Sequence, residues 1–521
     1  MSELNNIKSE ISDVSKGENL VIKENVFILI GSIVLAVIFN MLFYEKELGV
    51  SYPIFVLVLY GVLIFTLRDK IELKINFGTL LTLPIIMLSL TYLFFSNWKF
   101  MLLNFMIIPA LIFVQTLLIT NNNDYKWFDV RFLFDFFNAI FVRTLAHIFK
   151  PFNLVSEIIK RKQNSTRTSV ISKVVIGLII SVPLVGVVVG LLSEADQVFG
   201  HFIGNITELF IKMNIGDLFA QLIIGFLIAI IAFSYLWSLY NKKDRNTSRV
   251  IEDSFKIRKI WDPIIIMTIL LSVNLIYVIF TAIQFKYLFG SIGALLPEGV
   301  TYAEYARRGF FELVAVTIIN VSILTSIINF TKNDNVIIAK VLKILNSLLI
   351  VSTMVMLLSA HFRMSLYEEE YGYTYLRVFT HAFMIFIFVI LIATLIKVWM
   401  EKFSLLKSYI VVALIAYLSI NYFNADAFIA DNNIRRFEAD SGKMIDIYYL
   451  NSLSDDAVPY MVKLLDNPNE QVAIDMKYTL ISRKIRLTSK NDWQSFNLSK
   501  YRAKDILDGY DLVEGVESDS R

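Results

Sequence analysis

Eleven apolar runs, each close to the roughly 20 residues that cross a bilayer as a helix, constrain this chain more than any other feature. They cover residues 26–43, 50–67, 77–96, 101–120, 171–192, 216–240, 262–283, 310–330, 338–358, 376–398 and 405–423. Hydrocarbon offers no hydrogen bonds to the backbone, so each run must be a helix despite its many Ile, Val and Phe residues. The sequence therefore predicts an all-α integral membrane protein with about 11 transmembrane helices.

The composition agrees with this fold class and excludes several functions. Of the 521 residues, 56% are hydrophobic and 18% are charged, against roughly 25% charged in an ordinary soluble domain. A net charge of +3 is too small to indicate a nucleic-acid partner, and the absence of cysteine excludes disulfides and thiolate metal sites. The chain has no P-loop, dinucleotide fingerprint, kinase signature or nucleophile elbow. We therefore expect no cofactor and no nucleic-acid partner.

The positions of Lys and Arg predict the orientation of the spans. The loops at 68–76, 121–170 and 241–261 carry 3, 8 and 7 of these residues, whereas the first three loops on the other side carry one each. Basic loops remain on the cytoplasmic side. We expect a cytoplasmic N-terminus, and an extracytoplasmic C-terminus because the number of spans is odd, in the cell (plasma) membrane.

Two regions outside the spans have a predicted structure of their own. The aromatic stretch 128–150 is interrupted by charged residues such as Arg131 and Arg143, which predicts an interfacial amphipathic helix on the inner leaflet. In the tail, three helices are predicted to start after Ser454, at Asn467-Pro468, and at Ser499. The expected parts are a cytoplasmic segment 1–25, a four-helix membrane region 26–120, a cytoplasmic loop 121–170, a seven-helix membrane region 171–423, a small helical extracytoplasmic domain 424–508 and an acidic, disordered tail 509–521.

Several loops on the predicted outer face resemble a known family. They are LLSEADQVFG (191–200), QFKYLFG (284–290), TYAEYARRGFFEL (301–313), SAHFRMSLYEEEYGYTYLR (359–377) and NADAFIADNNIRRF (424–437). The chain resembles bacterial polytopic membrane proteins of the domain-of-unknown-function families 4173 and 4153. The resemblance implies a bacterial multi-pass membrane protein and brings no reaction with it.

The same loops concentrate arginine, tyrosine and glutamate, and supply the candidate ligand-binding residues. Arginine forks bind phosphate or carboxylate, and tyrosine offers a flat ring and a hydroxyl. The alternative is that these residues anchor helix ends at the head-group belt. The candidates are Tyr302, Glu304, Arg307, Arg308, Glu312, Arg363, Tyr367, Tyr371, Arg377 and Asp196.

Metal binding and coupled transport receive less support from the sequence. Asp196 lies near Glu194 and His201, but the spacing is not that of a dedicated metal site, so we expect none. His361 near Arg363 could serve in acid–base chemistry, although such a histidine is more often structural. The spans contain Asn274 and Asn320 but no convincing mid-membrane charge, which counts against an ion-coupled pump.

These observations favour a non-catalytic, multi-pass cell-membrane protein. Its predicted partners are membrane lipids, and it is expected to bind or sense an anionic envelope component, such as a lipid head group or a lipid-linked precursor, through its outer loops. Two alternatives stay open: a transporter or lipid translocase, and a membrane-embedded transferase acting on a lipid-linked substrate.

Overall fold

The fold of the chain is given by a computed structural model that describes residues 24–71, 74–161, 215–241, 259–289, 302–332, 335–440, 443–488 and 492–512, with scattered residues between 177 and 199. Within these ranges the structure is helical, and the one pairing of extended backbone is an isolated bridge between Trp261 and Thr331. Nine described helices are long and apolar enough to cross a membrane. The chain is a multi-pass helical membrane protein, which confirms the predicted fold class at this level.

The nine helices correspond to nine of the eleven apolar runs. They are Glu24–Phe43, Phe77–Phe94, Trp98–Ile119, Phe219–Tyr240, Pro263–Ile283, Glu312–Phe330, Val336–Tyr371, Tyr375–Trp399 and Leu405–Tyr422. A tenth run forms the shorter apolar helix α2 (Ser51–Leu67). The run 171–192 lies largely outside the described residues, so the count of eleven spans stays a prediction.

Contacts divide the chain into two compact units. The first comprises Met1–Leu93, Leu103–Ile251 and Asn491–Asn497, and the second comprises Phe94–Leu102, Glu252–Lys490 and Leu498–Arg521. Each unit is described by itself.

Unit 1 is held together by polar groups that pair between its apolar helices. It contains the helix Glu24–Phe43, α2, α3 (Phe77–Leu80), most of α4 (Thr82–Phe94) and of α5 (Trp98–Ile119), and α11 (Ile215–Tyr240). The buried Gln115 side chain accepts from the Tyr60 hydroxyl at 2.6 Å and donates to Thr82 Oγ1 at 2.6 Å. In an apolar bundle such pairs stabilise helix association by about 0.6–2 kcal/mol each.

The predicted interfacial helix is a bent series of shorter helices. They are α6 (Phe132–Phe137), the π-helical turn η1 (Asn138–Arg143), α7 (Thr144–Ala146) and α8 (Lys150–Arg161), with a 43° bend between Phe132–Ala146 and Lys150–Ile158. The polar side chains are tied to protein backbone: Asp135 accepts from the Asp124 and Tyr125 N–H groups, and Arg143 donates to the Asn122 carbonyl. The exposed face is apolar and includes Phe134, Phe137, Phe141 and Leu145. This arrangement suits contact with lipid; the depth and the leaflet stay predictions.

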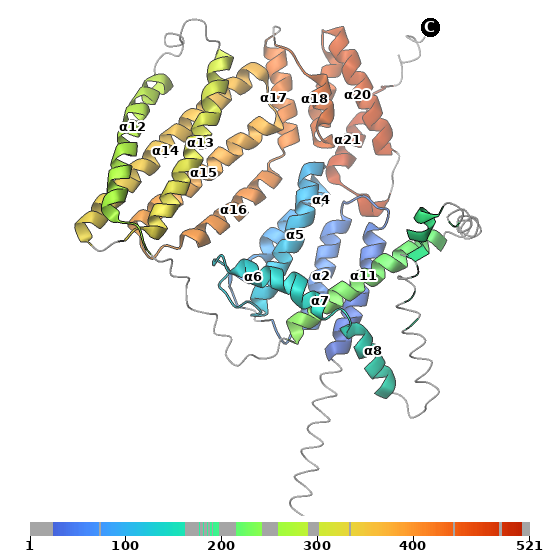
Figure 1. The fold of residues 1–521 in the computed structure, drawn as a ribbon. Coiled ribbons are helices and arrows are strands. Elements are labelled where there is room, and N and C mark those ends of the chain that lie inside the picture. Colours follow the sequence, from blue (N-terminus) through green and yellow to red (C-terminus); the bar gives the residue numbers. More distant parts are fainter. Residues whose placement is uncertain are drawn as a thin grey trace, which may run out of the picture. The chain divides into compact units, whose positions relative to one another are not determined.

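Five long helices form the membrane part of unit 2. They are α12 (Pro263–Phe289), α13 (Tyr302–Phe330), α14 (Val336–Tyr371), α15 (Tyr375–Trp399) and α16 (Leu405–Tyr422). Helix α14 packs against α12, α13 and α15, and α15 packs against α16 (Figure 1). With 36 residues, α14 is about 54 Å long, well beyond the ~30 Å hydrocarbon core. Its polar last turns therefore extend out of the hydrocarbon.

The mid-span asparagines join helices of this bundle. Asn320 accepts from the Tyr277 hydroxyl at 2.8 Å and donates to Thr353 Oγ1 at 2.9 Å, while Asn274 donates to the Leu345 carbonyl at 3.0 Å. Asn274 and Asn320 are 1% and 0% exposed. They therefore serve as interhelical hydrogen-bonding groups in a packed core.

The C-terminal part of unit 2 is a cluster of short helices around an apolar core. The helices are α17 (Ala425–Ala439), α18 (Ile447–Ser452), α19 (Val458–Met461), α20 (Glu470–Thr488) and α21 (Leu498–Asp508), with the 3-10 turns η3 (Asp455–Ala457) and η4 (Val462–Asp466). Helix α20 starts two residues later than the predicted Pro468, because Asn469 rather than Asn467 accepts from the first free N–H groups, those of Gln471 and Val472. The tail beyond residue 512 lies outside the described residues.

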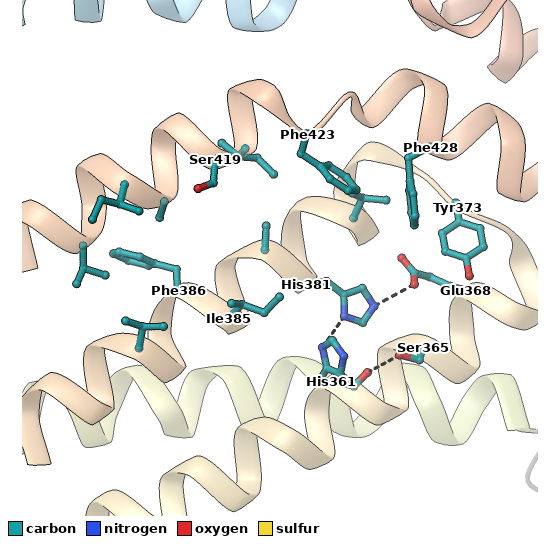
Figure 2. Close-up of a pocket in the computed structure, with 17 residues that line it drawn as sticks. His361, Ser365, Glu368, Tyr373, His381, Ile385, Phe386, Ser419, Phe423 and Phe428 are labelled. Carbon is teal, nitrogen blue, oxygen red and sulfur yellow. Dashed lines mark hydrogen bonds and ion pairs between the residues drawn. The ribbon is translucent and has the colours of Figure 1, made fainter. Parts of the chain in front are cut away.

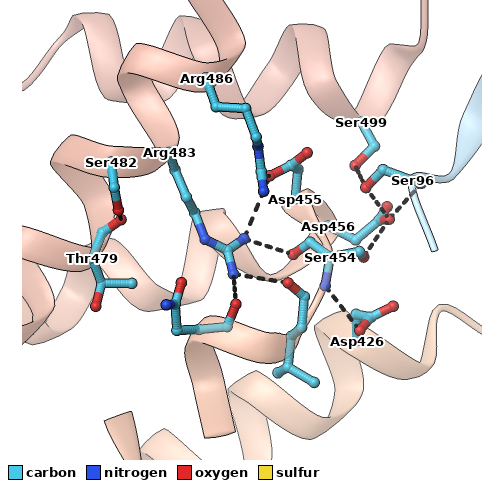
Figure 3. A network of polar contacts seen from close by, with 12 residues as sticks. Ser96, Asp426, Ser454, Asp455, Asp456, Thr479, Ser482, Arg483, Arg486 and Ser499 are labelled. Carbon is cyan, nitrogen blue, oxygen red and sulfur yellow. Dashed lines mark hydrogen bonds and ion pairs between the residues drawn. The ribbon is translucent and has the colours of Figure 1, made fainter. Parts of the chain in front are cut away.

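Two polar anchors fix this cluster (Figure 3). Arg483 is buried and donates to the carbonyls of Asn451, Leu453 and Ser454 at 2.7–3.0 Å, so it satisfies the end of α18. Asp456 Oδ2 accepts from Ser96 N at 2.8 Å and from Ser96 Oγ at 2.9 Å, which ties the turn before α5 to the C-terminal helices.

The turn between α14 and α15 is a third anchored point. Gly372 has φ +81° and ψ 178°, a conformation essentially confined to glycine. Asn433 of α17 accepts from the Tyr373 N–H at 2.6 Å and donates to the Tyr373 carbonyl at 2.9 Å. Arg436 donates to the carbonyls of Glu369 and Glu370 at the end of α14. The turn therefore sets how α14 faces α15.

Replacing Gly372 with alanine should destabilise this hairpin. A Cβ at this position would lie 2.6 Å from Asn433 Oδ1 in addition to the strained φ. We expect the free energy of unfolding to fall by about 1–3 kcal/mol, measured by denaturant titration in mixed micelles. The control is Gly61→Ala in α2, where a Cβ meets nothing within 4 Å and alanine favours the helix by up to about 1 kcal/mol. An equal effect of both substitutions would contradict the strain argument.

Replacing Asp456 with asparagine should change both stability and its pH dependence. Burial raises the pKa of Asp456, so its stabilising contribution is fully present below the unfolded pKa of about 3.9 and is lost as the pH rises through the raised folded value. We expect Asp456→Asn to cost about 1–3 kcal/mol because the amide leaves a donor unpaired. In thermal melts, the difference in stability between the wild type and Asp456→Asn should increase as the pH falls from 7 to 4. The control Asp475→Asn, at an exposed site on α20, should leave both quantities unchanged.

Candidate functional site

A cavity of about 690 Å³ lies between α15 and α16 in unit 2. One face of each helix lines it, at the helical spacing of three and four residues. The lining residues are Val378, His381, Ala382, Ile385, Phe386 and Val389 of α15, and Val412, Ile415, Ala416, Ser419, Ile420 and Phe423 around α16. Eleven residue steps on each helix correspond to a length of about 16 Å. We call this cavity the α15–α16 groove.

The groove is apolar along most of its length and open on one side. Ile385 of α15 and Ile415 of α16, which both line it, are each 59% exposed. Its volume falls within the roughly 300–1,000 Å³ of small-molecule sites. An apolar groove between membrane helices can take the acyl or isoprenoid chain of a lipid directly from the bilayer.

Polar side chains gather at the end of the groove near the α14–α15 turn (Figure 2). His381 Nε2 lies 3.0 Å from Glu368 Oε2, and His381 Nδ1 lies 2.7 Å from His361 Nδ1. The two rings are nearly perpendicular, at 78°. Glu368 and His361 come from α14 and His381 from α15, so the anchored turn holds the three side chains together. We call them the Glu368–His381–His361 cluster.

The carboxylate of this cluster is buried. Glu368 is only 4% exposed, and within the described part of the chain its Oε1 has no hydrogen-bond partner. Burying an ionised carboxylate is costly unless donors or charges compensate it. The His381 N–H is the nearest such donor, although it is not aimed straight at Oε2. The cluster is thus a buried polar group beside an apolar groove, which is a typical composition for a ligand site.

Tyr373 adds a neutral hydroxyl at the same end of the groove. Burial, followed by the charges of Glu368 and Glu369, raises the pKa of Tyr373. The phenol therefore remains a hydrogen-bond donor at neutral pH. Among the described residues no group of three or more His, Cys, Asp or Glu side chains, the Glu368–His381–His361 cluster included, is arranged so that it could hold a metal ion.

Three of the candidate residues predicted from the sequence are brought together beside this site. The Arg377 guanidinium lies over the Tyr367 ring at 4.5 Å, and the Tyr367 and Tyr371 rings are 4.8 Å apart. Arg377 also donates to the Gly372 carbonyl. This geometry makes Arg377 part of the α14–α15 turn. Arg363 lies on α14, half-buried, two residues after His361.

The structure does not place the other candidates beside these. Tyr302, Glu304, Arg307 and Arg308 belong to α13, but their side chains lie outside the described residues. Glu312 is exposed on the same helix. Asp196 belongs to unit 1, where it is exposed and accepts from the Phe199 N–H at 3.1 Å.

Sequence analysis missed Glu368 and His381 as partners of His361. A usable signal exists, because His361 and Glu368 are seven residues apart and so share one face of a helix. In an antiparallel hairpin centred near Tyr373, His381 lies opposite residue 365, between those two positions. The pairing of His381 with His361 and Glu368 can be predicted only after the turn at 372–374 has been located. The spacing alone also does not show which of the three glutamates at 368–370 faces the inside of the hairpin.

Comparison with known proteins supplies a family. The family model described as Domain of unknown function (DUF4153) matches residues 82–464. The chain belongs to the DUF4153 family. Membership of family 4173 is not shown by this match. No curated protein and no solved structure matches the chain. The residues matched to DUF4153 include the α15–α16 groove and the whole Glu368–His381–His361 cluster.

Proposed function

We propose that this DUF4153 protein binds a membrane amphiphile in the α15–α16 groove, with the chain along α15 and α16 and the polar head at the Glu368–His381–His361 cluster. The observation that carries the proposal is the union of an open apolar groove of about 690 Å³ with a buried carboxylate at one end. Neither feature alone would distinguish a lipid from a packing defect.

The position of the groove along the helices supports an amphiphile rather than a wholly apolar ligand. His361 is ten residues before the end of α14, and His381 is six residues after the start of α15, so both lie about 10–15 Å from the helix ends. The residues that continue the groove, from Ile385 to Val389 and from Val412 to Ala416, belong to the apolar middles of their spans. A lipid would thus place its head near the interface and its chain in the hydrocarbon.

The proposed ligand is anionic and the proposed location is the outer face of a bacterial cell membrane. The excess of Lys and Arg in the loops 68–76, 121–170 and 241–261 supports a cytoplasmic N-terminus and an outer position for the α14–α15 turn and the C-terminal helices. Arg363, on α14 two residues after His361, is a cation that would attract a phosphate or carboxylate head, and Arg307 and Arg308, whose side chains lie outside the described residues, are proposed to assist it. The protein would then bind or sense an envelope lipid or a lipid-linked precursor.

Filling the groove should displace the ligand. We expect Ile415→Trp to weaken lipid binding by about 5- to 100-fold, since overpacking costs about 1–3 kcal/mol. The lower affinity should appear as less co-purifying lipid, measured by mass spectrometry after purification in mild detergent. The matched control is Ile279→Trp on α12, where the isoleucine is 57% exposed, close to the 59% of Ile415, and does not line the groove. Identical lipid content in wild type and both variants would overturn the proposal. Loss in Arg307→Gln or Arg363→Gln as well would support an anionic head.

A further inference from the structure

The short contact between the two histidines restricts which ring nitrogens carry protons. At 2.7 Å, two N–H groups facing each other would clash and two lone pairs would repel, so one of the two Nδ1 atoms donates and the other accepts. Which one donates depends on the hydrogen bond that the other nitrogen of each ring makes.

Glu368 favours one direction. Its Oε2 lies 3.0 Å from His381 Nε2, out of line for a hydrogen bond, but a carboxylate oxygen at this distance repels a lone pair and attracts an N–H, so it favours a proton on Nε2. In a neutral ring the other nitrogen, Nδ1, is then the acceptor. His361 then donates from Nδ1 to His381 Nδ1, which leaves a lone pair on His361 Nε2; Figure 2 shows the contact between the two rings.

From this chain of contacts we propose that the Glu368–His381–His361 cluster presents His361 Nε2 as a hydrogen-bond acceptor to the head of the bound amphiphile, which must carry a hydroxyl or amine donor. The inference rests on the proposed function and names the chemical class of its ligand. A lipid head that offers only acceptors leaves this nitrogen unpaired, and such a loss costs affinity.

The arrangement has a chemical purpose that a single histidine would lack. An isolated imidazole can present either nitrogen as donor or acceptor, so it would discriminate little between heads. Here Glu368 is buried beside His381, and its Oε1 has no hydrogen-bond partner among the described residues. The carboxylate thus fixes both rings, and the site recognises a donor. Glu368 and His381 are positioning residues; His361 is the residue that contacts the ligand.

The first test measures the tautomers directly. The chain has four histidines, so the ¹⁵N spectrum of histidine-labelled protein in detergent can be assigned with His361→Phe and His381→Phe variants. We expect protonated Nε2 in His381 and protonated Nδ1 in His361 in the wild type at neutral pH. A protonated Nδ1 in His381, or an imidazolium at either position, would overturn the inference whatever the protein binds.

The second test measures the preference for a donor with two lipids of equal charge. Native mass spectrometry of the full chain would be titrated with dioleoyl phosphatidylglycerol, which has two head-group hydroxyls, and dioleoyl phosphatidylmethanol, which has none. We expect phosphatidylglycerol to bind about five- to tenfold more tightly, the effect of one net hydrogen bond. Glu368→Gln should abolish the difference because glutamine can donate or accept and no longer fixes the rings. The control Glu369→Gln, at the exposed neighbouring position, should keep it.

The outcomes separate this inference from the proposed function. Equal binding of the two lipids by the wild type, with both weakened by Ile415→Trp, would leave a lipid site in the groove but overturn the donor requirement. Binding of both lipids that is indifferent to Ile415→Trp would overturn the groove itself. A preference for phosphatidylglycerol that survives Glu368→Gln would assign recognition to another group and would overturn the role of the cluster.

Discussion

The clamp on the α14–α15 turn is the interaction on which the site depends. Asn433 binds both backbone groups of Tyr373, and Arg436 binds the last carbonyls of α14. Together with the glycine-only backbone at Gly372, these contacts fix the rotation of α14 against α15. That rotation places His361 and Glu368 beside His381, at one end of the α15 face that lines the groove with α16.

A second constraint is that apolar surroundings tolerate few unsatisfied polar groups. In the bundle, Asn320 connects α12, α13 and α14, and Gln115 does the same between neighbouring helices of unit 1. Glu368 Oε1, like Asn274 Oδ1 and several other buried polar atoms, has no hydrogen-bond partner among the described residues, and Glu368 also lines the groove. A buried carboxylate beside an open groove is a candidate for a functional site.

The sequence predicted the membrane-spanning class because twenty-residue apolar runs have few other structures available to them. It placed Arg377 and Tyr367 in one loop but did not reveal that Arg377 lies on the Tyr367 ring and caps the turn. Glu368 and His381 escaped notice because a run of three glutamates and a histidine among phenylalanines show no spacing until the helices are paired. The late start of α20 was missed for a local reason: two asparagines compete for the cap, and only geometry decides which carbonyl oxygen meets the free N–H groups.

The anchoring of Ser96 and Asn97 has a consequence for biogenesis. Asn97 donates to Asp426 across 329 residues of sequence, and Ser96 to Asp456 across 360. At synthesis rates of about 5–20 residues per second, the turn before α5 exists for roughly 15 to 70 seconds before its acceptors are made. During that time seven further described helices of bilayer length are synthesised, and the donors of the turn lack the acceptors that they have in the folded chain. The C-terminal helices thus supply the acceptors for donors in the turn between α4 and α5. A chain whose synthesis stops before Asp426 would never form these hydrogen bonds.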